Sequence, residues 1–321
     1  MQPLNHSLWR IQTQSAQPPR QAPPAQRKPR RRWRLRLFLA SSLALIACLA
    51  GLLIYGLLLF RSATNVLVLG IDRRPNEGYT VRTDTMLLVR ADPSNRQLVL
   101  LSIPRDLWVT IPGRGEERIN AAHVYGELEA PGQGPARAAE TVSLNFEIPV
   151  PHTLRLDFDA FRSVIDAAGG IEIDVPATIV DNAYPTDDYG TTRIEIQAGL
   201  QHMDGETALR YARTRHASND FERAARQQQV FVALARKLSS PTGWLRVPQV
   251  LQAFQSVVDT DLSIHDLLRL LLAWQRAGGD SIAKIVIDQT MTTSFRTAQG
   301  AQVLLPRWEL ILPLVQAQFA P

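Results

Sequence analysis

The chain has 321 residues, of which 45% are hydrophobic and 20% charged, as is ordinary for a globular protein with one large or two small domains. It contains a single cysteine, which excludes an internal disulfide. The net charge of +5 is unevenly spread, because residues 1–36 carry +9 with no acidic residue and leave −4 for residues 37–321. The basic character therefore belongs to a short tail and not to the folded body.

An uncharged run of 24 residues, 37–60 (LFLASSLALIACLAGLLIYGLLLF), follows that tail. A helix of this length rises about 1.5 Å per residue and is long enough to cross a hydrocarbon core of about 30 Å. The alternative is a cleaved signal peptide, but its apolar region is normally about 7 to 15 residues long. We therefore predict an uncleaved transmembrane helix, which contains the one cysteine, Cys48.

The basic tail indicates the orientation of this helix. Eight of its nine charges lie between Arg20 and Arg36, and the positive-inside rule places such a segment in the cytoplasm. A basic segment that contains prolines can also be a nucleic-acid-binding arm, but its position beside the membrane favours contact with anionic lipid. We predict no nucleic-acid partner, a cytoplasmic tail (1–36), a transmembrane helix (37–60) and an extracytoplasmic domain (62–321).

Residues 65–175 alternate between buried strands and helices. Continuous apolar runs predict strands at 65–71 (NVLVLGI), 84–92 (DTMLLVRAD) and 97–104 (QLVLLSIP). The later patterns predict helices at 119–130 and 134–146, a strand at 152–158, an amphipathic helix at 158–170 and a strand at 171–175. These elements predict an α/β fold whose central sheet is covered by helices on both faces.

Charged residues gather at the ends of the first three predicted strands. They are Asp72, Arg82, Asp84, Arg105 and Asp106. Each of them, taken singly, can be a turn residue or part of a surface ion pair. Ligands of open α/β sheets collect at strand ends, however, and five charged residues after three consecutive core strands favour a binding site.

A second cluster lies in residues 211–229 (YARTRHASNDFERAARQQQ), which contain Arg213, Arg215, Arg223 and Arg226. The two acidic residues of this stretch suit the start of a helix. On a helical wheel Arg223, Arg226 and Gln227 lie opposite the apolar side, with Arg226 the more surface-like. Gln228 falls within the apolar side, where a buried amide needs partners. The excess of arginine has two interpretations, a solvated charged face or a site for an anionic ligand such as phosphate.

Six segments follow one another behind the predicted transmembrane helix: NVLVLGID, RTDTMLLV, SIPRD, RINAAHVYG, FDAFRSVIDAAGGI and GLQHMDGETALRYARTRHASNDFERAARQQQ. In this order they resemble the LytR-CpsA-Psr family, over a core of roughly residues 65–238. The resemblance implies a central mixed sheet flanked by helices. It also implies a bacterial phosphotransferase that moves a glycopolymer, such as teichoic acid or capsule, from a polyprenyl-pyrophosphate carrier onto peptidoglycan.

The resemblance also implies the residues of the site. Magnesium, or manganese in its place, would be held by Asp72 and Asp84. Pyrophosphate would be bound by seven residues: Arg82, Arg105, Arg118, Arg213, Arg215, Arg223 and Gln227. The lipid would lie in an apolar tunnel. The catalytic candidates are Asp84, Arg105, Arg213, Arg215 and Asp220.

Phosphoryl transfer depends mainly on positioning and charge neutralisation, so Mg²⁺ and arginines can carry it without a protein nucleophile. The sequence leaves open whether Asp84, Asp106 or Asp220 is the base. Two features depart from the family pattern. The loop between Arg215 and Asp220 looks shorter than usual, and Arg118 stands where lysine is commoner, which keeps the charge but not the ammonium geometry.

Two other classes of function are alternatives. One is a membrane-tethered module that binds polyprenyl pyrophosphate or wall polymer without catalysis, or that only hydrolyses the pyrophosphate. The other is a transcription regulator, which would need its working domain within 36 cytoplasmic residues, where no helix-turn-helix is visible. An aspartate pair beside arginines favours metal-assisted transfer over both.

Residues 239–321 carry no recognisable motif, and we assign them to the same domain. Their patterns predict two helices joined at TDLS (260–263), a strand at KIVIDQ (284–289) and a closing helix or strand pair at VLLPRWELILPLVQAQF (303–319). The six histidines of the chain lack metal-ligand spacing, so no zinc site is predicted.

Overall fold

The computed structural model describes residues 30–59, 63–73, 77–186, 188–214, 220–278 and 282–320. The chain divides into two compact units, Met1–Leu53 and Ile54–Pro321. The first helix, α1 (Arg30–Leu59), contains a stretch of 21 residues, Arg36–Gly56, with a mean hydropathy of 2.6 and no buried part. By length and composition this stretch is a candidate membrane span, as an uncharged run of leucine and alanine predicts.

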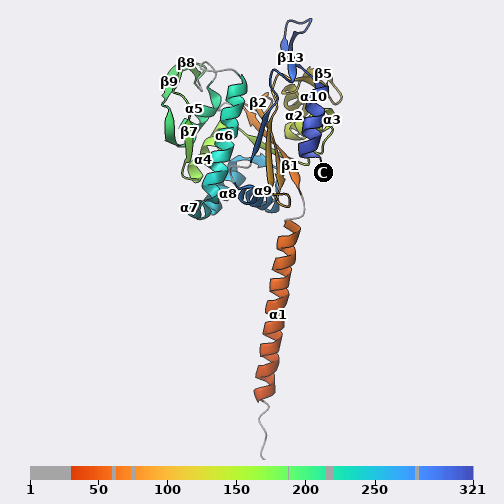
Figure 1. Ribbon diagram of the computed structural model, residues 1–321, viewed down its shortest axis with the longest axis vertical. Helices are drawn as coiled ribbons and strands as arrows, with labels where there is room; N and C mark the ends of the chain where they lie inside the picture. The colour runs from red at the N-terminus through yellow and green to blue at the C-terminus, as the bar shows by residue number, and fades with distance from the viewer. Residues whose placement is uncertain are drawn as a thin grey trace, which may run out of the picture. The chain divides into compact units, whose positions relative to one another are not determined.

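The second unit is built on a six-stranded sheet in the order β11-β6-β1-β2-β3-β12 (Figure 1). Its strands are β1 (Thr64–Ile71), β2 (Thr83–Asp92), β3 (Gln97–Ser102), β6 (His152–Leu156), β11 (Asp259–Thr260) and β12 (Ala283–Val286). β1, β2 and β3 pair in antiparallel fashion, whereas β6 runs parallel to β1 and β12 parallel to β3. The three apolar runs thus form the centre of a mixed sheet, which confirms the predicted fold class.

Helices cover both faces of the sheet because successive strand residues point to opposite sides. Leu67, Leu88 and Leu101 pack in one core with residues of α2 (Ala121–Glu129), α3 (Gly134–Phe146) and α10 (Trp308–Phe319). Leu87, Val89 and Leu100 pack on the other face with residues of α6 (Asp220–Ser239) and α9 (Ile264–Ala277). The remaining helices are α4 (Phe158–Ala167), α5 (Gly205–Arg213), α7 (Pro241–Trp244) and α8 (Val247–Val257).

Four two-stranded sheets lie outside the central sheet. They pair β4 (Trp108–Ile111) with β5 (Gly115–Arg118), β7 (Ile171–Val175) with β10 (Gly199–Met203), β8 (Ile179–Pro185) with β9 (Thr191–Ile196), and β13 (Thr292–Arg296) with β14 (Gln302–Pro306). The predicted strand at 171–175 is therefore not a central strand. Its alternation of buried and exposed residues is that of a strand with one solvated face.

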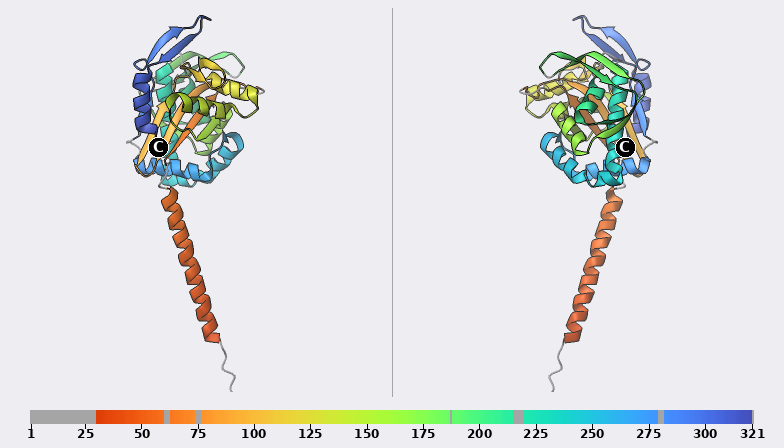
Figure 2. Two further views of the ribbon diagram at one scale, coloured as in Figure 1. Left: turned by 90° about the vertical axis from the view of Figure 1, so that its right-hand side faces the viewer. Right: turned by 90° about the vertical axis from the view of Figure 1, so that its left-hand side faces the viewer.

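The last third of the chain follows its predicted pattern, and α7, β11 and β13 are additional elements. The two helices joined at TDLS are α8 and α9, and the predicted strand at 284–289 is β12. The closing segment is a strand followed by a helix, β14 and α10, rather than one or the other. β13 was not predicted, and its hairpin with β14 projects from the domain (Figure 2).

Two buried polar side chains tie the central strands to α10. Asn65 of β1 donates to the carbonyl of Phe319 over 2.9 Å, and Arg90 of β2 donates to the same carbonyl over 3.0 Å. The Phe319 side chain is fully buried in the core between the sheet and α3. Because an unpaired buried polar group costs about 1–3 kcal/mol, both strands depend on the last turn of α10.

Candidate active site

A β-bulge at the start of β2 positions the first acidic residue of the site. Gly70 pairs with Thr85 and Ile71 with Thr83, so Asp84 is the extra residue between them. A bulge re-aims a side chain and is common beside active sites. A Cβ on Gly70 would lie 2.9 Å from that of Thr85, which explains the glycine. Asp72 follows Ile71 directly, so both carboxylates belong to the same end of neighbouring strands.

Arg105 follows β3 and connects two acidic residues. Its Nη1 donates to Asp84 Oδ1 over 2.6 Å, and its Nε lies 3.5 Å from Asp106 Oδ2. Burial lowers the pKa of Arg105, but the nearby carboxylates of Asp84, Asp106 and Asp220 outweigh it, so that this pKa is raised above its ordinary value. The buried Nε makes no hydrogen bond of good geometry. It is therefore a donor that a ligand oxygen can satisfy.

The first turns of α6 supply the second arginine. Arg223 is buried and its Nη1 lies 2.6 Å from Asp220 Oδ1, one turn earlier on the helix. Gln227 lies one turn later on the same face. Arg213, at the end of α5, instead contacts Asp72, with 3.2 Å between its Nη2 and Oδ2, and packs on the ring of Phe158.

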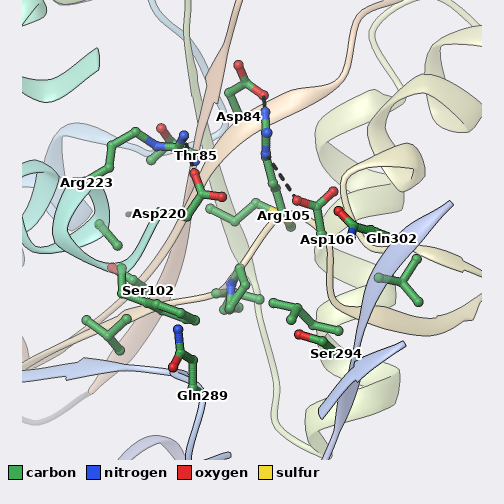
Figure 3. A pocket seen from close by; sticks show the side chains of 18 of the residues that line it. Asp84, Thr85, Ser102, Arg105, Asp106, Asp220, Arg223, Gln289, Ser294 and Gln302 are labelled. Atoms are coloured by element: carbon green, nitrogen blue, oxygen red, sulfur yellow. Dashed lines mark hydrogen bonds and ion pairs between the residues drawn. The ribbon is translucent and has the colours of Figure 1, made fainter. Parts of the chain in front are cut away.

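A cavity of about 510 Å³ lies between the start of β2, the end of β3, the start of α6 and the β13–β14 hairpin (Figure 3). Arg105, Arg223 and Gln227 line it, whereas Asp72 and Arg213 do not. Its charged lining residues are Asp84, Arg105, Asp106, Asp220, Arg223 and Arg296. A cavity of this size takes a ligand larger than two phosphates. Buried arginines with neighbouring carboxylates can hold an anion or an anion with a metal ion.

One apolar cavity adjoins the polar one, and a second adjoins the first. The first, about 170 Å³, shares Asp84, Thr85, Arg223 and Gln227 with it. The second, about 270 Å³, shares five apolar residues with the first and extends between the sheet and α6, α8 and α9: Val68, Leu156, Val164, Phe231 and Leu234. The site thus consists of a charged chamber followed by an apolar passage, with Asp84 and Arg223 at the junction.

The structure places the predicted site residues differently. Asp84, Arg105, Asp220, Arg223 and Gln227 line the polar cavity together. Asp72 and Arg213 form an ion pair beside it, and Arg213 lines the smaller apolar cavity. Arg82 is exposed and lines neither of these two cavities. Arg215 lies outside the described residues.

The wheel-based prediction that Arg226 is surface-like was wrong. Arg226 is buried, and it donates from Nε to the carbonyl of Tyr211 over 3.0 Å and from Nη2 to that of Thr214 over 2.6 Å. Burial lowers the pKa of Arg226. The end of α5 packs against the side of α6 that carries Arg226. A helical wheel of α6 alone contains no information about this neighbour. Gln228 has the partners that its burial requires, Ser102 Oγ at 2.9 Å and the carbonyl of Ile285 at 2.8 Å.

Arg118, predicted to bind pyrophosphate, does not line the polar cavity. Its Nε lies 3.3 Å from Asp106 Oδ1, and its Nη2 donates to the carbonyl of Gln302 over 2.7 Å. The backbone N–H of Leu304 donates to the carbonyl of Asp106 over 2.9 Å. Arg118 therefore fastens the loop after β3 to β14.

Replacing Arg118 by lysine is expected to keep the charge but lose one of these two contacts, because a single ammonium cannot span both. We expect a loss of about 1–2 kcal/mol in the free energy of unfolding, or about 3 to 6 °C in Tm, measured by thermal denaturation. Arg114→Lys, at an exposed position, is the matched control. Equal Tm values for the two variants would contradict a fastening role.

Sequence reasoning missed the lining residues Ser102, Gln289, Ser294, Phe295, Arg296 and Gln302. All but Ser102 belong to the last third of the chain, where no motif was recognised. Their only local signal was a weakly patterned polar segment before the closing apolar run.

The side chains of Asp72 and Asp84 offer carboxylate oxygens, which are the kind of ligand that a magnesium ion binds. Mg²⁺ prefers oxygen ligands and is commonly held by one or two carboxylates together with substrate phosphate and water. No group of three or more His, Cys, Asp or Glu gathers among the described residues. Asp72 and Asp84 each contact an arginine. They suit a cation shared with a phosphate.

The LytR_cpsA_psr family model matches residues 59–307 of this chain. The polyisoprenyl-teichoic acid–peptidoglycan teichoic acid transferase TagU of Oceanobacillus iheyensis is 33% identical over 213 residues, 66% of this chain and 62% of that protein. TagV of Bacillus subtilis, which bears the same transferase name, is 33% identical over 211 residues, 64% of this chain and 51% of that protein. The chain thus matches between half and two thirds of the length of these relatives. The crystal structure of B. subtilis TagV superimposes with a TM-score of 0.67 at 27% identity, over 81% of this chain and 98% of that one.

Proposed function

The chain belongs to the LytR-CpsA-Psr family, and from this premise we propose that it is a membrane-anchored phosphotransferase. It moves a glycopolymer from a polyprenyl-pyrophosphate carrier onto peptidoglycan and forms a phosphodiester bond. The transferase names of TagU and TagV support the reaction class. The observation that carries the proposal is the junction of a charged chamber with an apolar passage at Asp84 and Arg223. A polyprenyl pyrophosphate has the same two-part character.

The proposed reaction exchanges one phosphorus–oxygen bond for another. A hydroxyl oxygen of peptidoglycan forms a bond to the phosphorus that carries the sugar. The bond from this phosphorus to the bridging oxygen breaks, and polyprenyl phosphate leaves with the electron pair. The hydroxyl proton passes to one of the carboxylates that line the chamber, Asp84, Asp106 or Asp220.

The arginines would supply most of the stabilisation. Phosphoryl transfer spreads negative charge over the phosphate oxygens, and fixed cations in a site poor in water stabilise that charge. Arg105 keeps its charge because its pKa is raised, and its buried Nε, 3.5 Å from Asp106 Oδ2, makes no hydrogen bond of good geometry. Arg223 lines both cavities and so lies at the lipid-side phosphate of the proposed donor.

Asp84, with Asp72 beside the bulge, would hold Mg²⁺ or Mn²⁺. When bound, the metal ion would neutralise charge on phosphate oxygens. Before the ion is bound, Arg105 and Arg213 neutralise these carboxylates, which limits the repulsion between them.

The direct test uses the full chain in detergent micelles with Mg²⁺, a synthetic lipid-pyrophosphate saccharide and peptidoglycan fragments. Mass spectrometry is expected to detect a phosphodiester adduct between the saccharide and the fragments. Donor binding without any adduct would overturn the proposal in favour of a binding module. Release of sugar phosphate without an adduct would identify a pyrophosphatase.

The proposed reaction requires the second unit to face the cell wall, as the +9 tail before an uncharged span predicts. Protease added to intact spheroplasts is expected to digest residues 62–321 while a cytoplasmic marker protein stays whole. Immunoblotting against the domain measures the result. A protected domain beside an intact marker would reverse the orientation.

A further inference from the structure

The β13–β14 hairpin forms a wall of the polar cavity that differs in chemistry from the rest. Ser294, Phe295 and Arg296 line it from β13, and Gln302 lines it from β14. Gln289, in the preceding loop, lies on the side away from Asp84 (Figure 3). Only one of these five side chains is charged, whereas five charged residues line the rest of the cavity.

Side-chain and backbone contacts connect the β13–β14 hairpin to the loop that carries Arg105. Arg118 and the N–H of Leu304 fasten β14 to Asp106, the residue after Arg105. At the base of the hairpin, the N–H of Arg307 donates to the carbonyl of Met291 over 2.9 Å. A ligand group bound on this wall therefore lies at a defined distance from Arg105.

The side chains of the wall suit a sugar. The polar atoms of Gln289, Ser294 and Gln302 make no side-chain hydrogen bond to another described residue. Phe295 leaves 50% of its surface exposed at the rim. Amide and hydroxyl groups match the hydroxyl and acetamido groups of a pyranose, and an exposed aromatic ring packs on the apolar face of such a ring.

The order of the cavities indicates which sugar of the proposed donor would lie against the hairpin. The smaller apolar cavity adjoins the chamber at Asp84, Thr85, Arg223 and Gln227, the larger one continues from it, and no hairpin residue lines either. A donor whose lipid enters the apolar passage and whose phosphates meet the arginines directs its first sugar toward the hairpin. On the basis of the proposed function, we propose that Gln289, Ser294, Phe295 and Gln302 bind the pyranose ring that is joined to the pyrophosphate.

Binding of two synthetic probes to the full chain in detergent micelles tests this. One probe is a short polyprenyl pyrophosphate, and the other carries an N-acetylhexosamine on its second phosphate. Phe295→Ala is expected to weaken the sugar-bearing probe about five- to tenfold and to leave the sugar-free probe unchanged. Gln302→Ala is expected to act in the same direction, because it keeps the carbonyl that Arg118 contacts. Thr293→Ala, exposed on the same strand but absent from the cavity lining, is the matched control.

Several outcomes would overturn the proposal. They are equal affinity of the unaltered protein for both probes, an equal loss for both probes in Phe295→Ala, and no loss for either. A raised KM for peptidoglycan with unchanged donor binding would assign the wall to the acceptor instead. These binding measurements do not need turnover. Absence of transfer by the unaltered protein would therefore count against the proposed function and leave the sugar assignment decided by the probes.

Discussion

Asp84→Asn is expected to abolish transfer while the domain stays folded. Asp84 is the extra residue of a bulge, it lines both the charged chamber and the apolar passage, and it contacts Arg105. The amide keeps the shape but removes the charge that a metal ion would need. We expect the single-turnover rate to fall by roughly 10²–10³-fold, as when one group that stabilises transition-state charge is lost.

The cost in stability separates this role from a structural one. The Asp84 side chain is 31% exposed and Arg105 keeps Asp106 as a neighbour, so loss of the pair costs about 1 kcal/mol or less after solvent screening. Asp72→Asn tests the same chemistry at the paired carboxylate, and both variants should weaken the Mg²⁺ dependence of the rate. A large drop in the metal-free Tm together with retained transfer would rule out the metal site.

Arg226→Met and Arg223→Met are expected to have opposite effects, although the two residues lie three positions apart. Arg226 makes two charged hydrogen bonds to carbonyls and is buried, so its loss leaves both acceptors unpaired. We expect a loss of about 3–5 kcal/mol in the free energy of unfolding and a drop of roughly 10 °C in Tm. Arg223 lines both cavities, so its loss is expected to weaken donor binding by at least about tenfold with a smaller change in Tm.

Thermal denaturation and binding of the sugar-free pyrophosphate probe measure the two effects. The methionine keeps most of the apolar stem in both variants, so the comparison isolates the guanidinium. Similar drops in Tm for both variants would mean that Arg223 is structural. Loss of probe binding in a well-folded Arg226→Met protein would place Arg226 in the site.

The sequence predicted the elements whose residues carry their own pattern. The runs at 65–71, 84–92 and 97–104 became the three central strands because all of their apolar residues are needed in two cores. The short strands β9 and β13 were missed, since most of their residues are exposed, and β8 was missed although its first four residues alternate between buried and exposed. The strand at 171–175 was found, but its partner β10 could not be predicted from its own residues.

The residues of the site likewise include some that the sequence could predict and some that it could not. Asp84, Arg105 and Arg223 could be predicted because they follow recognisable strands or open a helix. Arg226 shows the limit of this reasoning, since its environment is decided by carbonyls at the end of α5. Gln289, Ser294 and Gln302 lie about 200 residues from Asp84 in sequence, and the pairing of β12 with β3 together with the contacts of β14 with the loop after β3 brings their segment to the cavity. No local sequence pattern indicates that these distant segments lie side by side in the fold.

The contact of Asn65 and Arg90 with Phe319 has a consequence for the order of synthesis. The ribosome makes β1 and β2 early, but the carbonyl that satisfies both side chains belongs to α10, the last helix in the described part of the chain. Until that helix emerges, Asn65 keeps the carbonyl of Pro149, but both side chains lack the acceptor that they share, and the core lacks Phe319. A nascent chain stopped at residue 306 would contain every residue of the chamber but would lack this acceptor and the apolar residues of α10. Folding of the site is therefore expected to require α10 in addition to the segments that line the chamber.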